Sequence, residues 1–144
     1  HARSRRNLEA SGLDPEAVEH LTGDAIKELA RFAARKRVFD LIALDPPSFA
    51  SKASKDGKPW SAKKDYAELI TASLGVLAPG GVLVAVSSTH KMSTSDFEAA
   101  LAVGGKRAGK QLVIVERVWL PQDFPLLPGF ADGNYLKMAI CLVR

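Results

Sequence analysis

The chain is short of cysteine, and it contains no long run of apolar residues. Its single cysteine, Cys141, excludes an intramolecular disulfide framework and a zinc site built from several cysteines. The three histidines, at positions 1, 20 and 90, lack the spacing of metal ligands, so no metal site is expected. No apolar stretch approaches the roughly 18–20 residues that span a bilayer, and the charged start does not resemble a secretory signal. These absences predict a cytoplasmic protein without a membrane segment.

Charge of one sign is only slightly in excess. The 144 residues include 20 Lys and Arg against 16 Asp and Glu, which gives a net charge of +4. Such a balance permits a polyanionic partner without requiring one. With 47% hydrophobic and 25% charged residues, the composition is that of a globular protein, and the length suits one domain over residues 1–144.

Helical and strand patterns alternate along the chain. Apolar residues at helical spacing predict helices over residues 2–11, 24–36, 66–77 and 93–103. Short apolar runs predict buried strands over residues 38–44, 82–86, 112–120 and 135–143, and residues 18–21 could form another. The lysine-rich residues 51–64 and the Pro- and Gly-rich residues 121–133 are predicted loops. This alternation predicts a parallel α/β sheet that binds ligands beyond the carboxyl ends of its strands.

The corner Asp45-Pro46-Pro47-Ser48-Phe49 follows one of these predicted strands directly. Proline fixes φ and has no N–H, and a residue before proline is held extended, so the corner is stiff. Its carbonyl groups lack local donors. Asp45 or the Pro46 carbonyl could accept a hydrogen bond from a planar amine while Phe49 stacks on the face of that amine. Equally, Asp45 could cap the next turn and Phe49 could belong to the core.

Residues 39–49 (FDLIALDPPSF) resemble the fourth motif of class I S-adenosylmethionine-dependent methyltransferases, an (Asp/Asn)-Pro-Pro-x-aromatic corner that meets cofactor and target base. The likeness continues through residues 79–81, 87–92 and 134–137. Together these segments look like the catalytic domain of bacterial large-subunit ribosomal RNA methyltransferases, a group that includes 5-methylcytosine enzymes with a PUA domain. The resemblance implies a Rossmann-like sheet with helices on both faces, S-adenosyl-L-methionine as cofactor and RNA as substrate.

The resemblance also assigns roles to particular residues. Asp24 and Ala25 match the third motif, which holds the adenine edge of the cofactor. Asp45 and Pro46 match the fourth motif, which lies beside the methionine moiety of the cofactor and the reacting base. Asp45 and Pro47 are accordingly expected to bind the cofactor. The loop 51–64 falls where family members approach RNA.

That loop interleaves five lysines with Trp60, a pattern that suits phosphate contacts combined with base stacking. For any single lysine of this loop, the alternative to a phosphate contact is a solvated surface position without a partner.

Ser88 departs from the 5-methylcytosine members, which keep a cysteine at this place. Their reaction needs a thiolate to attack C6 of the pyrimidine, and a serine hydroxyl is far too weakly acidic to replace it. Ser88 therefore favours direct methyl transfer to a ring nitrogen or exocyclic amine, which needs only alignment. His90 could orient a base or a water, or could be structural. Cys141 lies among apolar residues and is expected to be an inert core residue.

A second departure concerns glycine. Class I methyltransferases hold the cofactor on a glycine-rich loop, yet this sequence contains no Gly-x-Gly. An acidic residue ending a second strand is missing too. We therefore expect a domain that lacks its first two strands and is inactive in isolation. An upstream part of the same domain or a second copy would complete the sheet.

Two alternatives to an RNA methyltransferase stay open at this point. The chain could be a non-catalytic RNA-binding or assembly module that retains the fold. It could also methylate a small molecule or a protein, since fold does not determine substrate. For an RNA substrate, we expect an unpaired or flipped target base.

Overall fold

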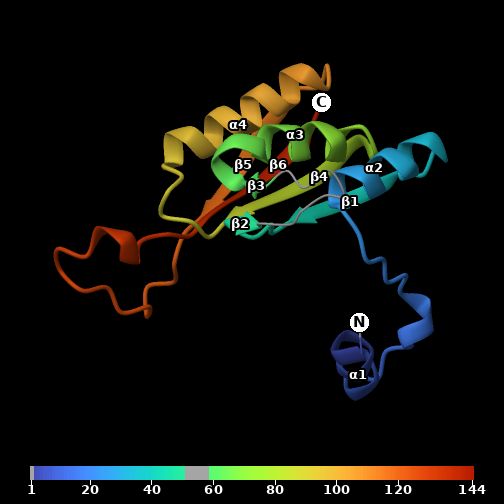
Figure 1. Cartoon of the computed structure of the whole chain (residues 1–144), viewed down its shortest axis with the longest axis horizontal. Coiled ribbons are helices and arrows are strands. Elements are labelled where there is room, and N and C mark those ends of the chain that lie inside the picture. Colours follow the sequence, from blue (N-terminus) through green and yellow to red (C-terminus); the bar gives the residue numbers. More distant parts are fainter. Residues whose placement is uncertain (1, 51–58) are drawn as a thin grey trace.

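Four strands form the central sheet, in the order β1-β4-β6-β5, in the computed structural model of the chain (Figure 1). They are β1 (Phe39–Leu44), β4 (Leu77–Ser87), β5 (Leu112–Val118) and β6 (Lys137–Val143). The structure describes residues 2–50 and 59–144, so His1 and much of the predicted basic loop lie outside the described residues.

Strand direction differs from the expected purely parallel sheet. β1 and β4 are parallel, whereas β6 is antiparallel to both β4 and β5. The reason lies in the connection between β5 and β6, which contains no crossover helix and simply turns the chain back. The Pro- and Gly-rich residues 121–133 form that turn and include a short 3₁₀ helix, Ala131–Gly133.

Helices cover one face of the sheet. α3 (Ala62–Leu74) and α4 (Thr94–Arg107) lie side by side over it, and α2 (Ala25–Ala34) packs next to α3 (Figure 1). Alternate strand residues are buried beneath these helices, among them Leu83, Ala85, Ala139, Cys141 and Val143. The opposite face carries half-buried Val82, Val84, Ile140 and Leu142, and no helix of the described residues covers it. The resemblance implied helices on both faces, so the described part differs on this point.

Side chains cap the starts of α2 and α4. The Asp24 carboxylate accepts hydrogen bonds from the backbone N–H groups of Ile26 and Lys27, at 3.0 and 3.3 Å. Ser93 forms a capping box with Asp96, which fixes the start of α4.

The third helix is shifted toward the amino end relative to its prediction. It begins at Ala62, because the Asp65 carboxylate accepts a hydrogen bond from the Ser61 N–H at 2.7 Å. Lys63 and Lys64 are therefore helical and not part of a loop. The helix ends at Leu74, and Leu77 begins β4.

α1 (Ala2–Ala10) and the 3₁₀ turn Pro15–Ala17 lie apart from the sheet (Figure 1). α1 ends before Gly12, whose φ of 71° is the left-handed conformation that glycine adopts freely. The predicted strand over residues 18–21 is wrong. Val18 and Leu21 are 42% and 45% exposed, because this segment finds no strand to pair with among the described residues. Among residues 2–50 and 59–144, no helix has the length and apolarity needed to cross a membrane.

Candidate cofactor and acceptor site

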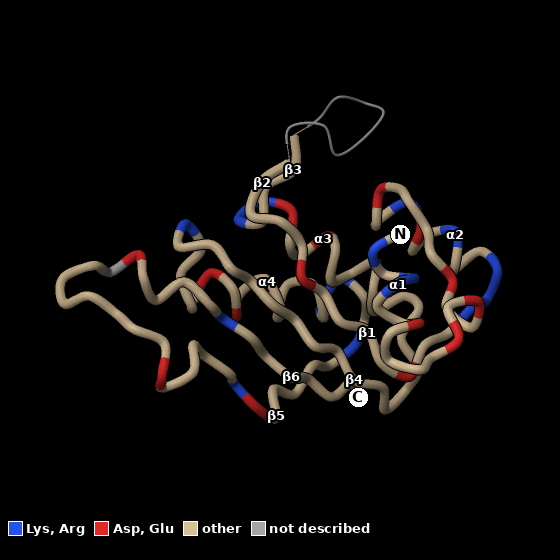
Figure 2. The backbone as a smooth tube through the Cα atoms, turned by 90° about the horizontal axis from the view of Figure 1, so that it is seen from below, with Lys and Arg blue, Asp and Glu red and all other residues tan. Residues whose placement is uncertain are grey.

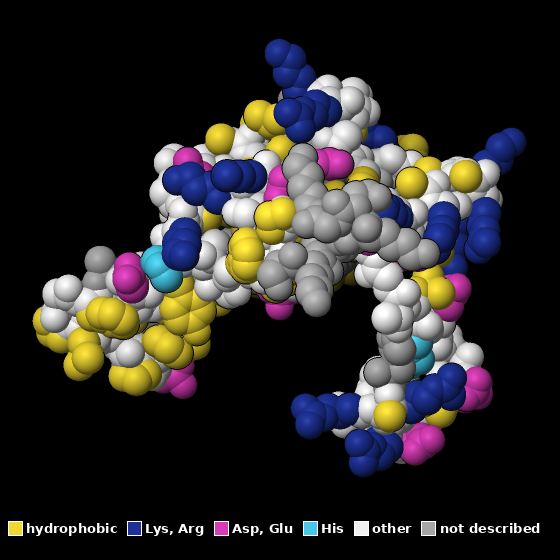
Figure 3. Space-filling view, in the orientation of Figure 1, with side chains coloured by type: hydrophobic (Ala, Val, Ile, Leu, Met, Phe, Trp, Pro, Cys, Tyr) yellow, Lys and Arg dark blue, Asp and Glu magenta, His cyan; other side chains and the backbone are white. Residues whose placement is uncertain are grey.

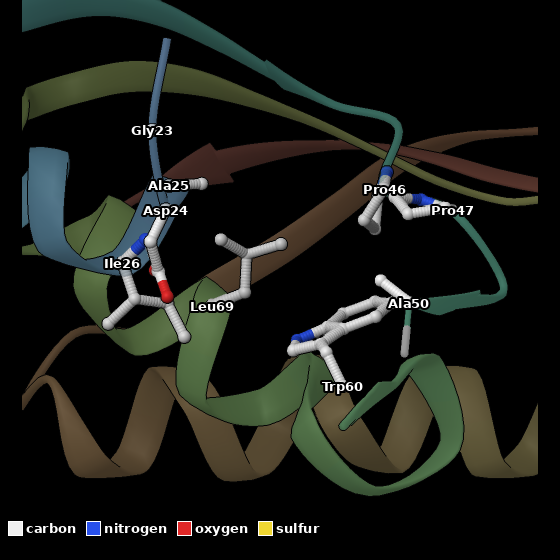
Figure 4. A pocket seen from close by; sticks show the side chains of 9 residues that line it. All are labelled: Gly23, Asp24, Ala25, Ile26, Pro46, Pro47, Ala50, Trp60 and Leu69. Atoms are coloured by element: carbon white, nitrogen blue, oxygen red, sulfur yellow. The ribbon is translucent and has the colours of Figure 1, made fainter. Parts of the chain in front are cut away.

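A cavity of about 320 Å³ lies between the start of α2 and the corner that follows β1 (Figure 4). Its lining residues are Gly23, Asp24, Ala25, Ile26, Pro46, Pro47, Ala50, Trp60 and Leu69. Asp24 and Ala25 form one wall and the two prolines face them, while the indole of Trp60 lies between (Figure 4). The structure thus brings together residues that the sequence assigned to two separate motifs.

Asp24 contributes the carboxylate of this cavity. Both hydrogen bonds from the start of α2 are accepted by Oδ1, so Oδ2 has no recorded partner among the described residues. The remaining walls are mostly apolar, from Ile26, Leu69 and Trp60. A flat apolar slot with one carboxylate oxygen at its edge suits a planar ring that carries an amino group.

Asp45 lies at the carboxyl edge of the sheet, just outside the cavity lining. Leu44 pairs with Ala85, which places Asp45 beside Val86 of β4. The side chain is exposed and is not turned into the apolar core. Its charge acts on the buried Tyr66 hydroxyl, which donates to the Val86 carbonyl at 2.7 Å. Burial raises the pKa of Tyr66 far above its usual value, and the Asp45 carboxylate raises it further.

Phe49 lies where the stacking role requires it, whereas Trp60 occupies a different place from the one expected. Phe49 is 61% exposed, which excludes the core alternative. It belongs to a two-stranded ribbon of β2 (Phe49–Ala50) and β3 (Trp60–Ser61), in which Ala50 pairs with Trp60. This pairing carries Trp60 into the cavity wall, whereas the sequence placed it on an RNA-facing loop. Only strand pairing across residues 51–58 brings Trp60 there, and local sequence carries no signal for it.

Ser88 and His90 lie in the loop that follows β4. Both are exposed, and neither lines the cavity that contains Asp24. Because β1 and β4 are parallel neighbours, this loop and the Asp45 corner meet at the same edge of the sheet. His90 borders a second, smaller cavity of about 250 Å³.

Cys141 is fully buried in β6, as expected of an inert core residue. Burial raises the pKa of Cys141 to about 11, so almost no thiolate exists near neutral pH. The expected core position of Cys141 is confirmed, and its lack of a nucleophilic role stays a prediction.

Positive charge is spread over α1, α2 and the start of α3, with acidic residues interspersed (Figure 2). Several of these cations are paired: Arg5 with Glu16, Arg31 with Glu28, Arg37 with Glu19, and Lys63 with Asp96. The described surface therefore presents no continuous basic stripe, and contact with a polyanion would depend on individual groups.

Known proteins are similar to almost the whole chain. Ribosomal RNA large subunit methyltransferase I of Pseudoalteromonas translucida is 33% identical over 141 residues, 97% of this chain. The protein of the same name from Photobacterium profundum is 32% identical over 142 residues, 98% of this chain. This chain is related to the large-subunit ribosomal RNA methyltransferases. It spans about a third of the length of these relatives, 35% of each. No family model matches the chain.

Solved structures agree with this relationship. SMU.776, crystallised in complex with SAH, has a TM-score of 0.86 and 27% sequence identity, and the match covers 99% of this chain and 36% of that one. The SAM-dependent methyltransferase from Agrobacterium tumefaciens, at a TM-score of 0.53 and 19% identity, shares the fold over 82% of this chain and 36% of its own. The resemblance to methyltransferases and the Rossmann-like fold class are confirmed.

Proposed function

We propose that this chain forms part of an S-adenosyl-L-methionine-dependent methyltransferase that acts on RNA, with ribosomal RNA as the favoured substrate. One observation supports this most strongly: the cavity joins Asp24 and Ala25 to the Pro46-Pro47 corner, in a chain related to ribosomal RNA methyltransferases. A ribosomal RNA substrate would place the protein in the cytoplasm.

The cavity residues fit the adenine end of the cofactor. Ile26, Leu69 and Trp60 offer apolar surface to the faces of a purine, and Asp24 Oδ2 can accept a hydrogen bond from its exocyclic amine. When bound, S-adenosylmethionine supplies an electrophilic methyl group. The described residues offer no glycine-rich loop for the remainder of the cofactor, and such a loop has no counterpart in this sequence.

The acceptor is held by the stiff corner after β1. Asp45 and the Pro46 carbonyl accept hydrogen bonds from the N–H groups of an amine or ring nitrogen, which orients its lone pair. The exposed ring of Phe49 stacks on the face of the base. After transfer, the proton released from the acceptor nitrogen passes to the Asp45 carboxylate or to water. Ser88 takes no covalent part, since no base in the described residues hydrogen-bonds to its hydroxyl.

Two substitutions in the protein that carries this chain test the acceptor site. We expect Asp45→Ala to lower the rate of methyl transfer to ribosomal RNA by roughly 100-fold or more, because the acceptor loses its alignment. Ser88→Ala should keep nearly full activity. Transfer of a radiolabelled methyl group measures both variants. Loss of turnover in Ser88→Ala alone would instead favour a covalent route, and RNA binding without cofactor binding would favour the non-catalytic module.

Asp24 allows the cofactor contact to be separated from helix capping. Asp24→Asn keeps a capping oxygen for α2 but presents an amide N–H₂ to the cavity, so we expect unchanged stability and weaker binding of S-adenosylhomocysteine. Asp24→Ala should lose both the helix cap and the cofactor contact, and loss of the cap should cost about 1 kcal/mol in the free energy of unfolding. Calorimetry and urea unfolding of the two variants measure these effects. Equal ligand affinity in Asp24→Asn and the parent would refute the assigned contact.

A further inference from the structure

Lys137 is the one charged side chain among the described residues that is buried, with only 5% of its surface exposed. Its Nζ donates a hydrogen bond to the Thr89 carbonyl at 2.8 Å. No carboxylate of residues 2–50 and 59–144 forms an ion pair with it. Burial lowers the pKa of Lys137, because the ammonium loses part of its hydration. A buried cation without an anion is costly, and such groups concentrate at functional sites.

Lys137 borders the cavity of about 250 Å³ beside the loop that follows β4. His90, Ser93, Thr94 and Asn134 supply further polar walls, and Trp119 supplies an aromatic one. Asp132 also borders this cavity, but its side chain is exposed, where solvent screens its charge. Ser87 pairs with Lys137, and β1 lies on the other side of β4, so the cavity is about 10 Å, two strand spacings, from the Asp45 corner.

A second lysine shows what a purely structural role looks like. Lys110 donates to the carbonyls of Leu74 and Leu77, both at 2.7 Å. These carbonyls lie at and beyond the carboxyl end of α3, where a cation is favoured, so the helix end accounts for Lys110. Among residues 2–50 and 59–144, Lys137 has one recorded carbonyl partner, and it borders a polar cavity, so it retains N–H donors for a ligand.

An apolar groove of about 500 Å³ adjoins this cavity and shares His90 and Asp132 with it. It lies along the loop between β5 and β6, where apolar side chains gather on the surface (Figure 3). The exposed members of this loop include Phe124, Leu127 and Phe130. No Lys or Arg occurs in residues 119–136, so the loop can stack bases but cannot neutralise phosphates.

We propose that Lys137 and His90 form a subsite that binds one phosphodiester group of a single-stranded RNA substrate, next to the acceptor corner. The ammonium donates charge-assisted hydrogen bonds to the phosphate oxygens. The strand then continues along the groove, with a base against the aromatic side chains. This inference rests on the proposed function, because it names how the RNA of that function is held.

The salt dependence of RNA binding tests the subsite in the protein that carries this chain. Fluorescence anisotropy with a labelled single-stranded oligonucleotide gives the slope of log K against log salt. Lys137→Met should bind more weakly and lower the magnitude of that slope by about 0.7, the value for one phosphate contact with a single strand. Lys137→Arg should keep the slope. Lys110→Met, which loses the same kind of carbonyl contact elsewhere, should leave it unchanged.

The position of His90 provides a second variant in case Lys137→Met does not fold. His90 is exposed, so His90→Ala should fold, and we expect RNA affinity to fall about fivefold, the effect of one hydrogen bond. If folded Lys137→Met has the same salt-dependence slope as the parent, or if His90→Ala binds RNA with the same affinity as the parent, the proposed subsite is wrong. Calorimetry with S-adenosylhomocysteine on the same samples reports on the proposed function separately, since that ligand does not reach Lys137 in the proposal.

Discussion

At the scale of single residues, burial determines which groups of this chain can react. Cys141 of β6 and Tyr66 of α3 both carry ionisable groups that are buried between the sheet and the helices, and burial keeps both protonated near neutral pH. Asp45, by contrast, is exposed at the edge of the sheet and stays available to an acceptor. Reactive character therefore follows the environment of each group and not its residue type alone.

The thiol of Cys141 gives a pH-dependent stability. Its pKa is about 11 in the folded chain and near 8.5–9 when unfolded, so between these values the folded state keeps a proton that the unfolded state releases. The free energy of unfolding therefore falls as pH rises through this window. We expect the parent to lose roughly 3 kcal/mol more than Cys141→Ala does, as an upper limit.

Urea unfolding of both proteins from pH 8 to 10.5 measures that difference. The charge of Cys141 also raises the pKa of Tyr66, but burial keeps folded Tyr66 protonated across this pH range, so the comparison still isolates the thiol. If the free energy of unfolding falls equally with pH in the two proteins, Cys141 is less buried than in this structure. Alkylation by iodoacetamide, slow in the folded chain and fast in urea, is an independent check.

At the scale of elements, close packing of α3 against α4 fixes the helical layer. Gly104 of α4 faces Ile70 of α3, and a Cβ added at Gly104 would lie 2.5 Å from Ile70 Cγ2. The rings of Tyr66 and Phe97 pack 5.7 Å apart in the same layer. Gly104 therefore serves helix packing, and it is not part of a cofactor loop.

Gly104→Ala tests this contact, because the sign of the change in the free energy of unfolding distinguishes overpacking from a gain in helix propensity. In an open helix, replacing Gly by Ala stabilises by about 1 kcal/mol. Here we expect a loss of about 1–3 kcal/mol in the free energy of unfolding, since the methyl group overpacks the interface. Val103→Ala, at a partly exposed position of the same helix, should change stability by less than about 0.5 kcal/mol.

Denaturant unfolding measures both variants, and a double-mutant cycle locates the effect. In an Ile70→Ala background, Gly104→Ala should cost little, because the clashing atoms are gone. An unchanged cost in that background would mean that another neighbour is responsible.

At the scale of the whole molecule, one face of the sheet is left without helices in the described part of the chain. Half-buried Val82, Val84, Ile140 and Leu142 line it, and Leu41 is 58% exposed. Monomers rarely expose a continuous apolar face of this kind. A further segment of the domain or a second copy, as expected from the sequence, stays a prediction for what covers it.

This face predicts the behaviour of the 144-residue chain on its own. We expect concentration-dependent association in sedimentation velocity, together with binding of the dye ANS. Leu41→Asp should reduce the association, with little change in stability because the side chain is already largely exposed. Val103 lies on α4, in the helical layer that covers the other face of the sheet, so Val103→Asp should leave association unchanged. A monomer at all concentrations would contradict this expectation.

The order of α2, α3, α4 and the four strands of the central sheet was predictable from sequence, because it depends on local patterns. The alternating runs of β4 and β6, the Asp24 cap and the Ser93 cap are each encoded within a few residues of where they act. The stiffness of the Asp45-Pro46-Pro47 corner is likewise local, because proline fixes its own backbone and that of its neighbour.

Contacts between distant segments were decided only by the tertiary structure. Trp60 reaches the cavity through pairing with Ala50, and Lys137 faces His90 because β6 pairs with β4. Residues 18–21 are apolar enough for a strand yet form none, because a strand exists only where another offers hydrogen bonds. Sequence thus determined which groups are present and how each turns locally, whereas long-range pairing determined which of them meet.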